Sequence, residues 1–307
     1  LHTMAFIIAQ RGQFSKFADL RLPAEYDRIV TGGDSMALDT EEARRERYKE
    51  IIQSFTLLDD VFMTAVFQDS LPCVDLVLQI ILDRPNLHAT HVVTQDTMKN
   101  LRGHDVRLDI HAFADGQEFN IEIQRAKKGA TPRRARFHCS IMDANALPEN
   151  TDYEELPEIY VIFITETDVL GKGKPLYEIE RILKDDGALF DDGTHIIYVN
   201  SSMVDTNTPL GRLMHDFRCA NPEEMYYDVL AERTGAFKRS EEGAIRMSSK
   251  WEEFVQEEYE KGMEKGAESA YLSSIRAMME KLSVTAEKAM DVLAIPQSEW
   301  GRYKALL

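Results

Sequence analysis

The chain has 307 residues, of which 44% are hydrophobic and 29% are charged, a composition typical of a globular protein with a sizeable core. It has no run of about 18 apolar residues, which argues against a transmembrane helix, and its first segment lacks the pattern of a signal peptide. Its three cysteines are isolated from one another, which favours a reducing compartment. We therefore expect a cytoplasmic protein without membrane association.

The formal net charge of −17 disfavours extensive contact with nucleic acid, because phosphate contacts need local positive charge. The charge is unevenly distributed, however. Between Lys99 and His138, nine Lys and Arg residues stand against five Asp and Glu residues, a local balance of +4. The middle of the chain is therefore suited to binding a phosphate.

Three regions are expected along the chain. Residues 1–40 have a loop-like composition and predict a weakly ordered N-terminal segment. Residues 41–235 begin with helical periodicity and then alternate strands and helices, as expected for a folded core. Residues 236–307 are predicted to form a helical tail, which ends in two short helices.

The centre of the chain carries the clearest secondary-structure signals. Its expected elements are strands at Val106–Phe113 and Glu118–Gln124, a helix from Thr131-Pro132 to about residue 146, and strands at Ile159–Thr165 and His195–Asn200. The third strand is a continuous apolar run, typical of a strand that is buried on both faces. Together these elements predict an α/β fold with a central mixed sheet flanked by helices.

The first two strands bracket Asp115-Gly116, a strong hairpin signal. A two-residue turn there pairs residues whose numbers sum to 231, so that Asp109 lies opposite Glu122 and Arg107 opposite Gln124. Alternation along each strand then places all four side chains on one face. Two opposed carboxylates repel each other, and a divalent cation would compensate for that repulsion. The alternative is a solvated polar face in which Arg107 neutralises both acids.

Several stretches share one family pattern: Val106-Arg-Leu-Asp109, Phe119-Asn-Ile-Glu122-Ile-Gln124-Arg125, Arg133-Arg-Ala-Arg136-Phe137, Leu156 to Thr165, Asp168, His195 to Asn200 and Leu213 to Phe217. Together they resemble the PD-(D/E)XK nuclease family transposases. The likeness covers roughly residues 36–260. It implies a restriction-endonuclease-like core, with the hairpin acids at one end of the sheet, where DNA would dock.

Carried over by position, the resemblance makes Asp109 and Glu122 ligands of Mg²⁺ or Mn²⁺. Gln124 takes the place of the Lys that many relatives use to orient water or to stabilise the charged phosphorane. Glutamine can hydrogen-bond a water but supplies no positive charge. The missing charge could come from Arg125 or Lys127, or from a second metal ion.

An upstream acid often completes the metal site in this superfamily. Asp60 resembles the acid that opens the family's helical motif, which makes it the candidate for a further metal ligand. Asp59, Asp69 and Asp75 stay open as alternatives, and so does a purely structural acid at the start of a helix.

A basic segment directly follows the second strand of the hairpin. Six basic residues and no acids occur in twelve positions, namely Arg125, Lys127, Lys128, Arg133, Arg134 and Arg136. Their position next to the hairpin predicts contacts with the DNA phosphates. The alternative is a solvated helix start that balances the acidic remainder of the chain.

These observations predict a metal-dependent DNA endonuclease that hydrolyses phosphodiester bonds, and the family implies a link to recombination or mobile elements. The alternative is a catalytically decayed module that binds nucleic acid or another protein.

In the tail, an apolar stripe recurs at helical spacing and must be covered. It consists of Tyr271, Ile275, Met278, Met279 and Leu282. We expect a homodimer that forms through residues 250–307. Two alternatives stay open: the stripe folds back onto its own domain, or residues 285–306 form a helix-turn-helix.

Overall fold

The computed structural model describes residues 49–100, 103, 105–282 and 284–307. The described residues divide into two compact units, residues 49–250 and residues 251–307. The predicted N-terminal segment 1–40 lies outside the described residues.

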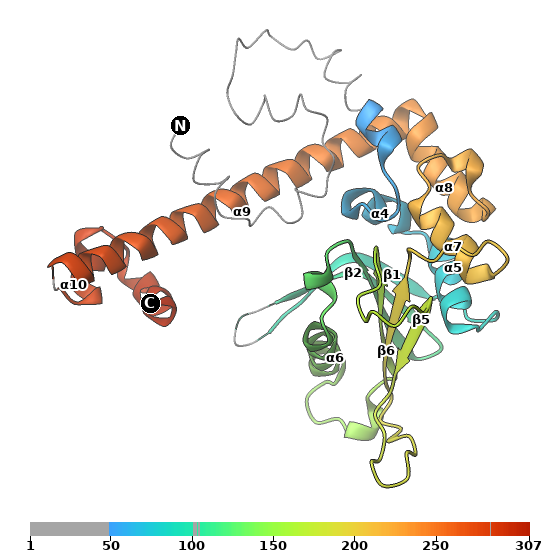
Figure 1. Cartoon of the computed structure of the whole chain (residues 1–307), viewed down its shortest axis with the longest axis horizontal. Helices are drawn as coiled ribbons and strands as arrows, with labels where there is room; N and C mark the ends of the chain where they lie inside the picture. Colours follow the sequence, from blue (N-terminus) through green and yellow to red (C-terminus); the bar gives the residue numbers. More distant parts are fainter. Residues whose placement is uncertain (1–48, 101–102, 104, 283) are drawn as a thin grey trace. The chain divides into compact units, whose positions relative to one another are not determined.

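A six-stranded mixed sheet forms the centre of the first unit, in the order β1-β2-β3-β4-β6-β5 (Figure 1). Its strands are β1 (His91–Met98), β2 (Val106–Ala114), β3 (Gln117–Gln124), β4 (Ile159–Thr165), β5 (Leu176–Ile179) and β6 (Thr194–Asn200). The central strands β3, β4 and β6 are parallel, whereas the outer strands pair antiparallel. The predicted α/β fold with a mixed central sheet is confirmed.

Helices cover both faces of this sheet. Those of the first unit are α4 (Asp60–Phe67), α5 (Leu71–Leu82), α6 (Pro132–Ala146), α7 (Pro209–Arg218) and α8 (Asp228–Arg239). Helix α6 lies on one side of the sheet, and α5, α7 and α8 gather on the other (Figure 1). Short 3-10 turns, η1 (Lys127–Ala130), η2 (Tyr153–Glu155) and η3 (Pro222–Glu224), connect these elements.

Helix α6 begins as its sequence predicts. The Thr131 side chain accepts a hydrogen bond from the Arg134 backbone N–H, and Pro132 occupies the first turn, where its missing N–H costs no hydrogen bond. The inner face of the helix packs Ala135, Cys139 and other apolar side chains against the sheet. This start fixes which α6 side chains point back toward β3.

Strands β1 and β5 are not predicted from the sequence. In β1 the residues do not alternate cleanly, and Gln95 has a left-handed backbone with φ of 56° in the middle of the strand. Strand β5 has only four residues and lies at the edge of the sheet. Neither strand therefore shows the periodicity of two on which the prediction relies.

No single helix among the described residues is long and apolar enough to cross a membrane. Helices α4 and α5 satisfy the length and composition only as a pair, which is bent by 108° at the break between them.

The second unit contains the end of α9 (Glu241–Leu282), then α10 (Ala286–Val292), the turn η4 (Gln297–Glu299) and α11 (Trp300–Leu306). Ile275, from the predicted apolar stripe, is fully buried in a small core with Met290 and Tyr303, and Met278 packs against that core. The short helices of the same tail thus cover much of the stripe. Tyr271 and Met279 are partly exposed, and the side chain of Leu282 lies outside the described residues.

Candidate active site

The hairpin of β2 and β3 has the register predicted from its turn. Asp115 and Gly116 both have positive φ, as a two-residue hairpin turn requires, and Ala114 pairs with Gln117. The paired numbers sum to 231 along the ladder as far as Ile110 and Ile121. The predicted register is therefore confirmed over this part of the hairpin.

Beyond Ile110 the two strands exchange side-chain hydrogen bonds in place of the backbone ladder. The Asp109 backbone N–H donates to Glu122 Oε1 at 3.2 Å, and the Ile123 N–H donates to Asp109 Oδ2 at 2.9 Å. Each carboxylate thus accepts from the neighbouring strand, which brings Asp109 and Glu122 together. Asp109 is half-buried, whereas Glu122 is fully buried.

The predicted pairing of Arg107 with Gln124 is not formed. The paired ladder between β2 and β3 ends before these residues, and Arg107 instead pairs with Thr97 of β1. The physical reason is that the Asp109 and Glu122 carboxylates take the N–H groups that a continued ladder would use.

Four side chains surround the buried Glu122 carboxylate, one of which is the hydrogen-bonded Asn120. Arg134 Nη2 lies 3.2 Å from Oε2, and Gln124 Nε2 donates to the same oxygen at 3.4 Å. His138 Nδ1 lies 3.6 Å from Oε1. Burial raises the pKa of Glu122, while the Arg134 charge and the hydrogen bond from Asp109 oppose that rise.

His138 is held as a neutral ring. Burial, together with the smaller effect of the nearby Arg134 charge, lowers its pKa to about 4. Arg134 Nε donates to His138 Nε2 at 3.2 Å, so the ring proton is on Nδ1. The Asn120 side chain lies 3.0 Å from Nδ1, and it also hydrogen-bonds the Glu122 carboxylate.

These contacts place two acids, a glutamine and an arginine around one point at the end of the β2–β3 hairpin. The same part of the chain resembles a known protein family. Residues 78–208 match the family model of the PD-(D/E)XK nuclease family transposases. The predicted resemblance is confirmed over this range, and neither the curated proteins nor the solved structures gave a match.

The PD-(D/E)XK match spans all six strands, helix α6 and the residues Asp109, Glu122 and Gln124. The mixed sheet with flanking helices is consistent with the restriction-endonuclease-like fold of that family. Asp60 and the tail lie outside the matched range.

The described residues contain no group of three or more His, Cys, Asp or Glu side chains arranged to hold a metal ion. Asp60, the predicted third ligand, accepts a hydrogen bond from the Gln95 side chain at 3.1 Å. Gln95 lies between Thr94 and Asp96, which pair with Ile110 and Leu108 of β2, and its buried Oε1 has no partner among the described residues. The hydrogen bond from Gln95 thus links Asp60 to β1, the strand next to the hairpin.

The alternative upstream acids have other partners. Asp59 bonds Thr56 and Arg125, and Asp75 bonds His88 and the Ala89 N–H. Asp69 is a loop residue with φ of 55° that follows α4.

The two hairpin carboxylates nevertheless fit a hard divalent cation, because they supply oxygen donors of the kind that Mg²⁺ and Mn²⁺ prefer. Magnesium usually takes one or two carboxylates and completes its shell with water and substrate oxygens, so a ready-made cage is not required.

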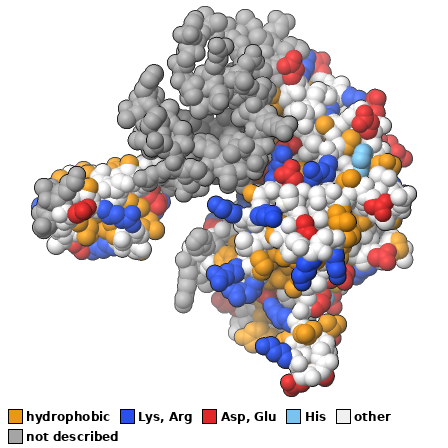
Figure 2. All heavy atoms as spheres, in the orientation of Figure 1, with side chains coloured by type: hydrophobic (Ala, Val, Ile, Leu, Met, Phe, Trp, Pro, Cys, Tyr) orange, Lys and Arg blue, Asp and Glu red, His pale blue; other side chains and the backbone are white. Residues whose placement is uncertain are grey.

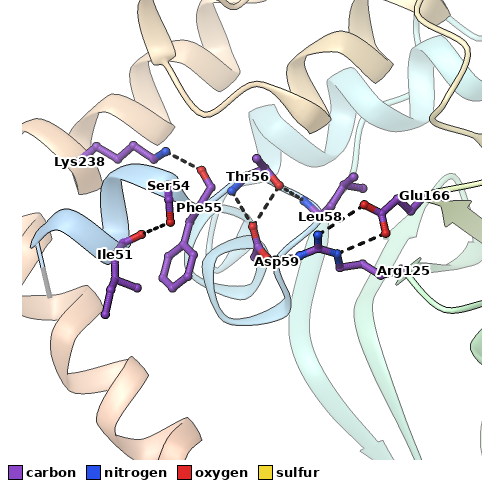
Figure 3. Close-up of polar contacts among 9 residues, drawn as sticks. All are labelled: Ile51, Ser54, Phe55, Thr56, Leu58, Asp59, Arg125, Glu166 and Lys238. Atoms are coloured by element: carbon purple, nitrogen blue, oxygen red, sulfur yellow. Dashed lines mark hydrogen bonds and ion pairs between the residues drawn. The ribbon is translucent and has the colours of Figure 1, made fainter. Parts of the chain in front are cut away.

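The basic segment separates into three groups. Arg125, predicted to face DNA or to supply the missing charge, instead bonds Asp59 at 2.6 Å and Glu166 at 3.4 Å (Figure 3). Arg134 reaches into the site. The other four side chains, Lys127, Lys128, Arg133 and Arg136, are exposed in η1 and α6. Figure 2 shows Lys and Arg side chains gathered over this part of the surface.

Two residues of the site are not predicted to belong to it from the sequence. His138 follows Arg134 by four positions, so helical spacing indicates that they stack, but it does not indicate the packing that turns both toward Glu122. Gly129 of η1 lies directly against Gln124: a Cβ at this position would overlap the Gln124 amide oxygen. No local pattern in the chain indicates that contact.

Proposed function

We propose that this protein is a metal-dependent DNA endonuclease that hydrolyses phosphodiester bonds at Asp109, Glu122 and Gln124. The observation that carries the proposal is the reciprocal hydrogen bonding of the two carboxylates across the end of the hairpin. These hydrogen bonds replace the backbone hydrogen bonds that an ordinary hairpin would form at this position. They hold the two carboxylates close together. The family match over residues 78–208 supports the same chemistry.

In this proposal Asp109 and Glu122 hold Mg²⁺ or Mn²⁺. The ion, when bound, supplies charge that activates water and stabilises the negative charge that develops on the phosphate. Gln124 orients the attacking water through its amide, which the tight contact with Gly129 keeps in one position. Lys127, Lys128, Arg133 and Arg136 contact the DNA phosphates, and they offset the acidic remainder of the chain locally.

The test is cleavage of supercoiled plasmid by the full chain with Mg²⁺ or Mn²⁺, compared with chelator. We expect nicked or linear product from the wild type, and a loss of at least about 100-fold in rate for Asp109→Asn and Glu122→Gln. Asp115→Asn is the matched control, since it makes the same change on the same hairpin, and asparagine suits this turn. Equal activity in Asp109→Asn and Asp115→Asn would contradict the proposal.

A catalytically decayed module that binds nucleic acid or a protein is the second candidate. It is favoured by the ion pair of Arg134 with Glu122 and by the lack of a three-ligand group among the described residues. Wild-type protein that binds duplex DNA but cleaves none with either metal would support this candidate.

We further propose that the chain forms a homodimer through residues 250–307, which would present two sites to one duplex. Support comes from side chains of the tail that stay exposed outside its small core: Met263, Tyr271, Met279 and Val292.

A further inference from the structure

Among the described residues, the cations expected to serve the reacting phosphate make no contact with Glu122. Gln124 is neutral, although the resemblance places it where many relatives carry Lys. Arg125 is neutralised between Asp59 and Glu166. Lys127 and Lys128 are exposed in η1, and the hydrogen bonds and ion pairs of Glu122 with the described residues involve neither of them. The side chain that does reach Glu122 with a positive charge is Arg134.

Two of the three guanidinium nitrogens of Arg134 contact other side chains of the site. Its Nη2 contacts Glu122 at 3.2 Å, and its Nε donates to His138 at 3.2 Å. The remaining nitrogen, Nη1, has no hydrogen-bond partner among the described residues, and 39% of the side chain is exposed. A guanidinium has five N–H donors in a planar fork that suits phosphate oxygens, so this arrangement leaves donors for a ligand.

The surroundings fix the direction of this fork. His138 is buried, and its Nδ1 side faces Asn120 and Glu122, so the ring cannot turn freely. Arg134 and His138 are four residues apart on α6 and therefore stack on the same helix face. The guanidinium is thus positioned by two buried groups rather than left to sample the solvent.

We propose that Arg134 is the catalytic cation of this site and donates from its open edge to a non-bridging oxygen of the scissile phosphate. The proposal rests on the proposed nuclease function. In the step that it serves, the oxygen of water forms a bond to phosphorus, and the bond from phosphorus to the leaving sugar oxygen breaks. A water proton passes to solvent, and the leaving oxygen takes a proton from solvent. Arg134 stays protonated and stabilises the negative charge that develops on the phosphate oxygens.

A second consequence concerns the metal-free protein. There the Arg134 charge pairs with Glu122, one of the two proposed metal ligands. A divalent cation must therefore bind next to a positive charge that competes for the same carboxylate oxygen. Removing this charge should favour metal binding while it harms cleavage. If Arg134 had only a structural role, its removal should weaken both metal binding and cleavage.

The experiment compares Arg134→Met, Arg134→Lys and the exposed control Lys184→Met, which removes one positive charge away from the candidate site, in the full chain. Four readouts are needed: single-turnover plasmid cleavage with Mg²⁺, duplex binding in chelator, Mn²⁺ affinity by calorimetry without DNA, and thermal unfolding. For Arg134→Met we expect cleavage to fall by about 100- to 1,000-fold relative to Lys184→Met, because one donor to the developing charge is removed. Its Mn²⁺ affinity should rise at least twofold, and Arg134→Lys should keep part of the cleavage.

A rescue variant keeps the test informative. Gln124→Lys in the Arg134→Met background moves the cation to the position where many relatives carry it, and it should restore cleavage at least tenfold. Cleavage by Arg134→Met within threefold of Lys184→Met would overturn the inference, as would weaker Mn²⁺ binding together with a lowered unfolding temperature. If the wild type binds Mn²⁺ and DNA but cleaves no DNA, the proposed nuclease function is wrong. The proposed role of Arg134 is then wrong as well.

Discussion

Gly129 and Gln124 are in direct contact: the Gln124 amide fills the space that a Cβ at position 129 would need. Only the far end of a flexible side chain is in the way, so the backbone can accept a larger residue if Gln124 moves. The glycine therefore matters for the position of Gln124 rather than for the fold.

We predict that Gly129→Ala lowers metal-dependent cleavage about tenfold and changes the free energy of unfolding by less than about 1 kcal/mol. Gly262→Ala is the matched control, because a Cβ there meets open space, and it should leave cleavage unchanged. In a Gln124→Ala background, Gly129→Ala should have no further effect, since the two changes act through one side chain. Additive losses in the double variant would count against this interpretation.

The exposed arginines of α6 should set the salt dependence of DNA binding. Arg133→Ala and Arg136→Ala are each expected to reduce the slope of log affinity against log salt by about 0.9, the value for neutralisation of one phosphate of duplex DNA. The measurement is fluorescence anisotropy with a labelled duplex across a salt series. An unchanged slope in the double variant would show that this face of the helix does not meet the phosphates.

Arg125 should behave in the opposite way, although it belongs to the same basic segment. Its guanidinium links Asp59 before α4 to Glu166 after β4, which ties two distant parts of the fold together (Figure 3). Arg125→Ala should lower the free energy of unfolding by roughly 1–2 kcal/mol, because it removes charged hydrogen bonds. Its salt slope for DNA should match that of the wild type. Denaturant unfolding and the same anisotropy series test both expectations.

Lys238 is a buried ammonium held by backbone carbonyls. Its Nζ donates to Phe55 O and Ala220 O at 2.5 Å and to Gln53 O at 3.1 Å. Lys238→Met would leave three acceptors without this donor, so we expect a loss of about 2–4 kcal/mol in the free energy of unfolding. Lys184→Met, at an exposed position, should stay within about 0.5 kcal/mol of the wild type.

The same lysine predicts a pH dependence. Burial lowers the pKa of Lys238 to about 8, while the negative charge of Asp59 opposes that shift. In the unfolded chain the group keeps its proton up to its ordinary value of 10.5, so between these values the unfolded state binds more protons than the folded state. The contribution of Lys238 to stability thus increases from pH 8 upward. Denaturant unfolding at pH 7 and pH 9.5 should show a larger loss for Lys238→Met at the higher pH, and a smaller loss there would contradict the assignment.

The homodimer is tested through the side chains that the tail leaves exposed. Met279→Glu and Val292→Glu change positions that are 37% and 59% exposed, so the fold of the tail should tolerate them. If these side chains form the interface between copies, light scattering should show a dimer for the wild type and a monomer for the double variant at micromolar concentration. A monomeric wild type would end the dimer proposal.

Several features of the fold and site depend on residues that are close together in the sequence, so they can be predicted from the sequence alone. The Asp115-Gly116 turn sets the register that brings Asp109 toward Glu122, because a two-residue turn leaves one pairing for the strands on either side of it. Thr131 and Pro132 mark the start of α6, and the apolar run Ile159–Thr165 marks the buried central strand. Each of these signals acts within a few residues of the chain, where turn geometry, capping and side-chain alternation operate.

The division of the basic residues between the site, the scaffold and the surface follows from tertiary packing instead. In the sequence Arg125 and Arg134 are equivalent members of one positive segment. In the fold, Arg125 meets Asp59, which is 66 residues away, whereas Arg134 turns inward to Glu122. The reason is that a guanidinium pairs with whichever carboxylate the packing of helices on the sheet brings within reach, and that packing depends on contacts between distant elements rather than on local pattern.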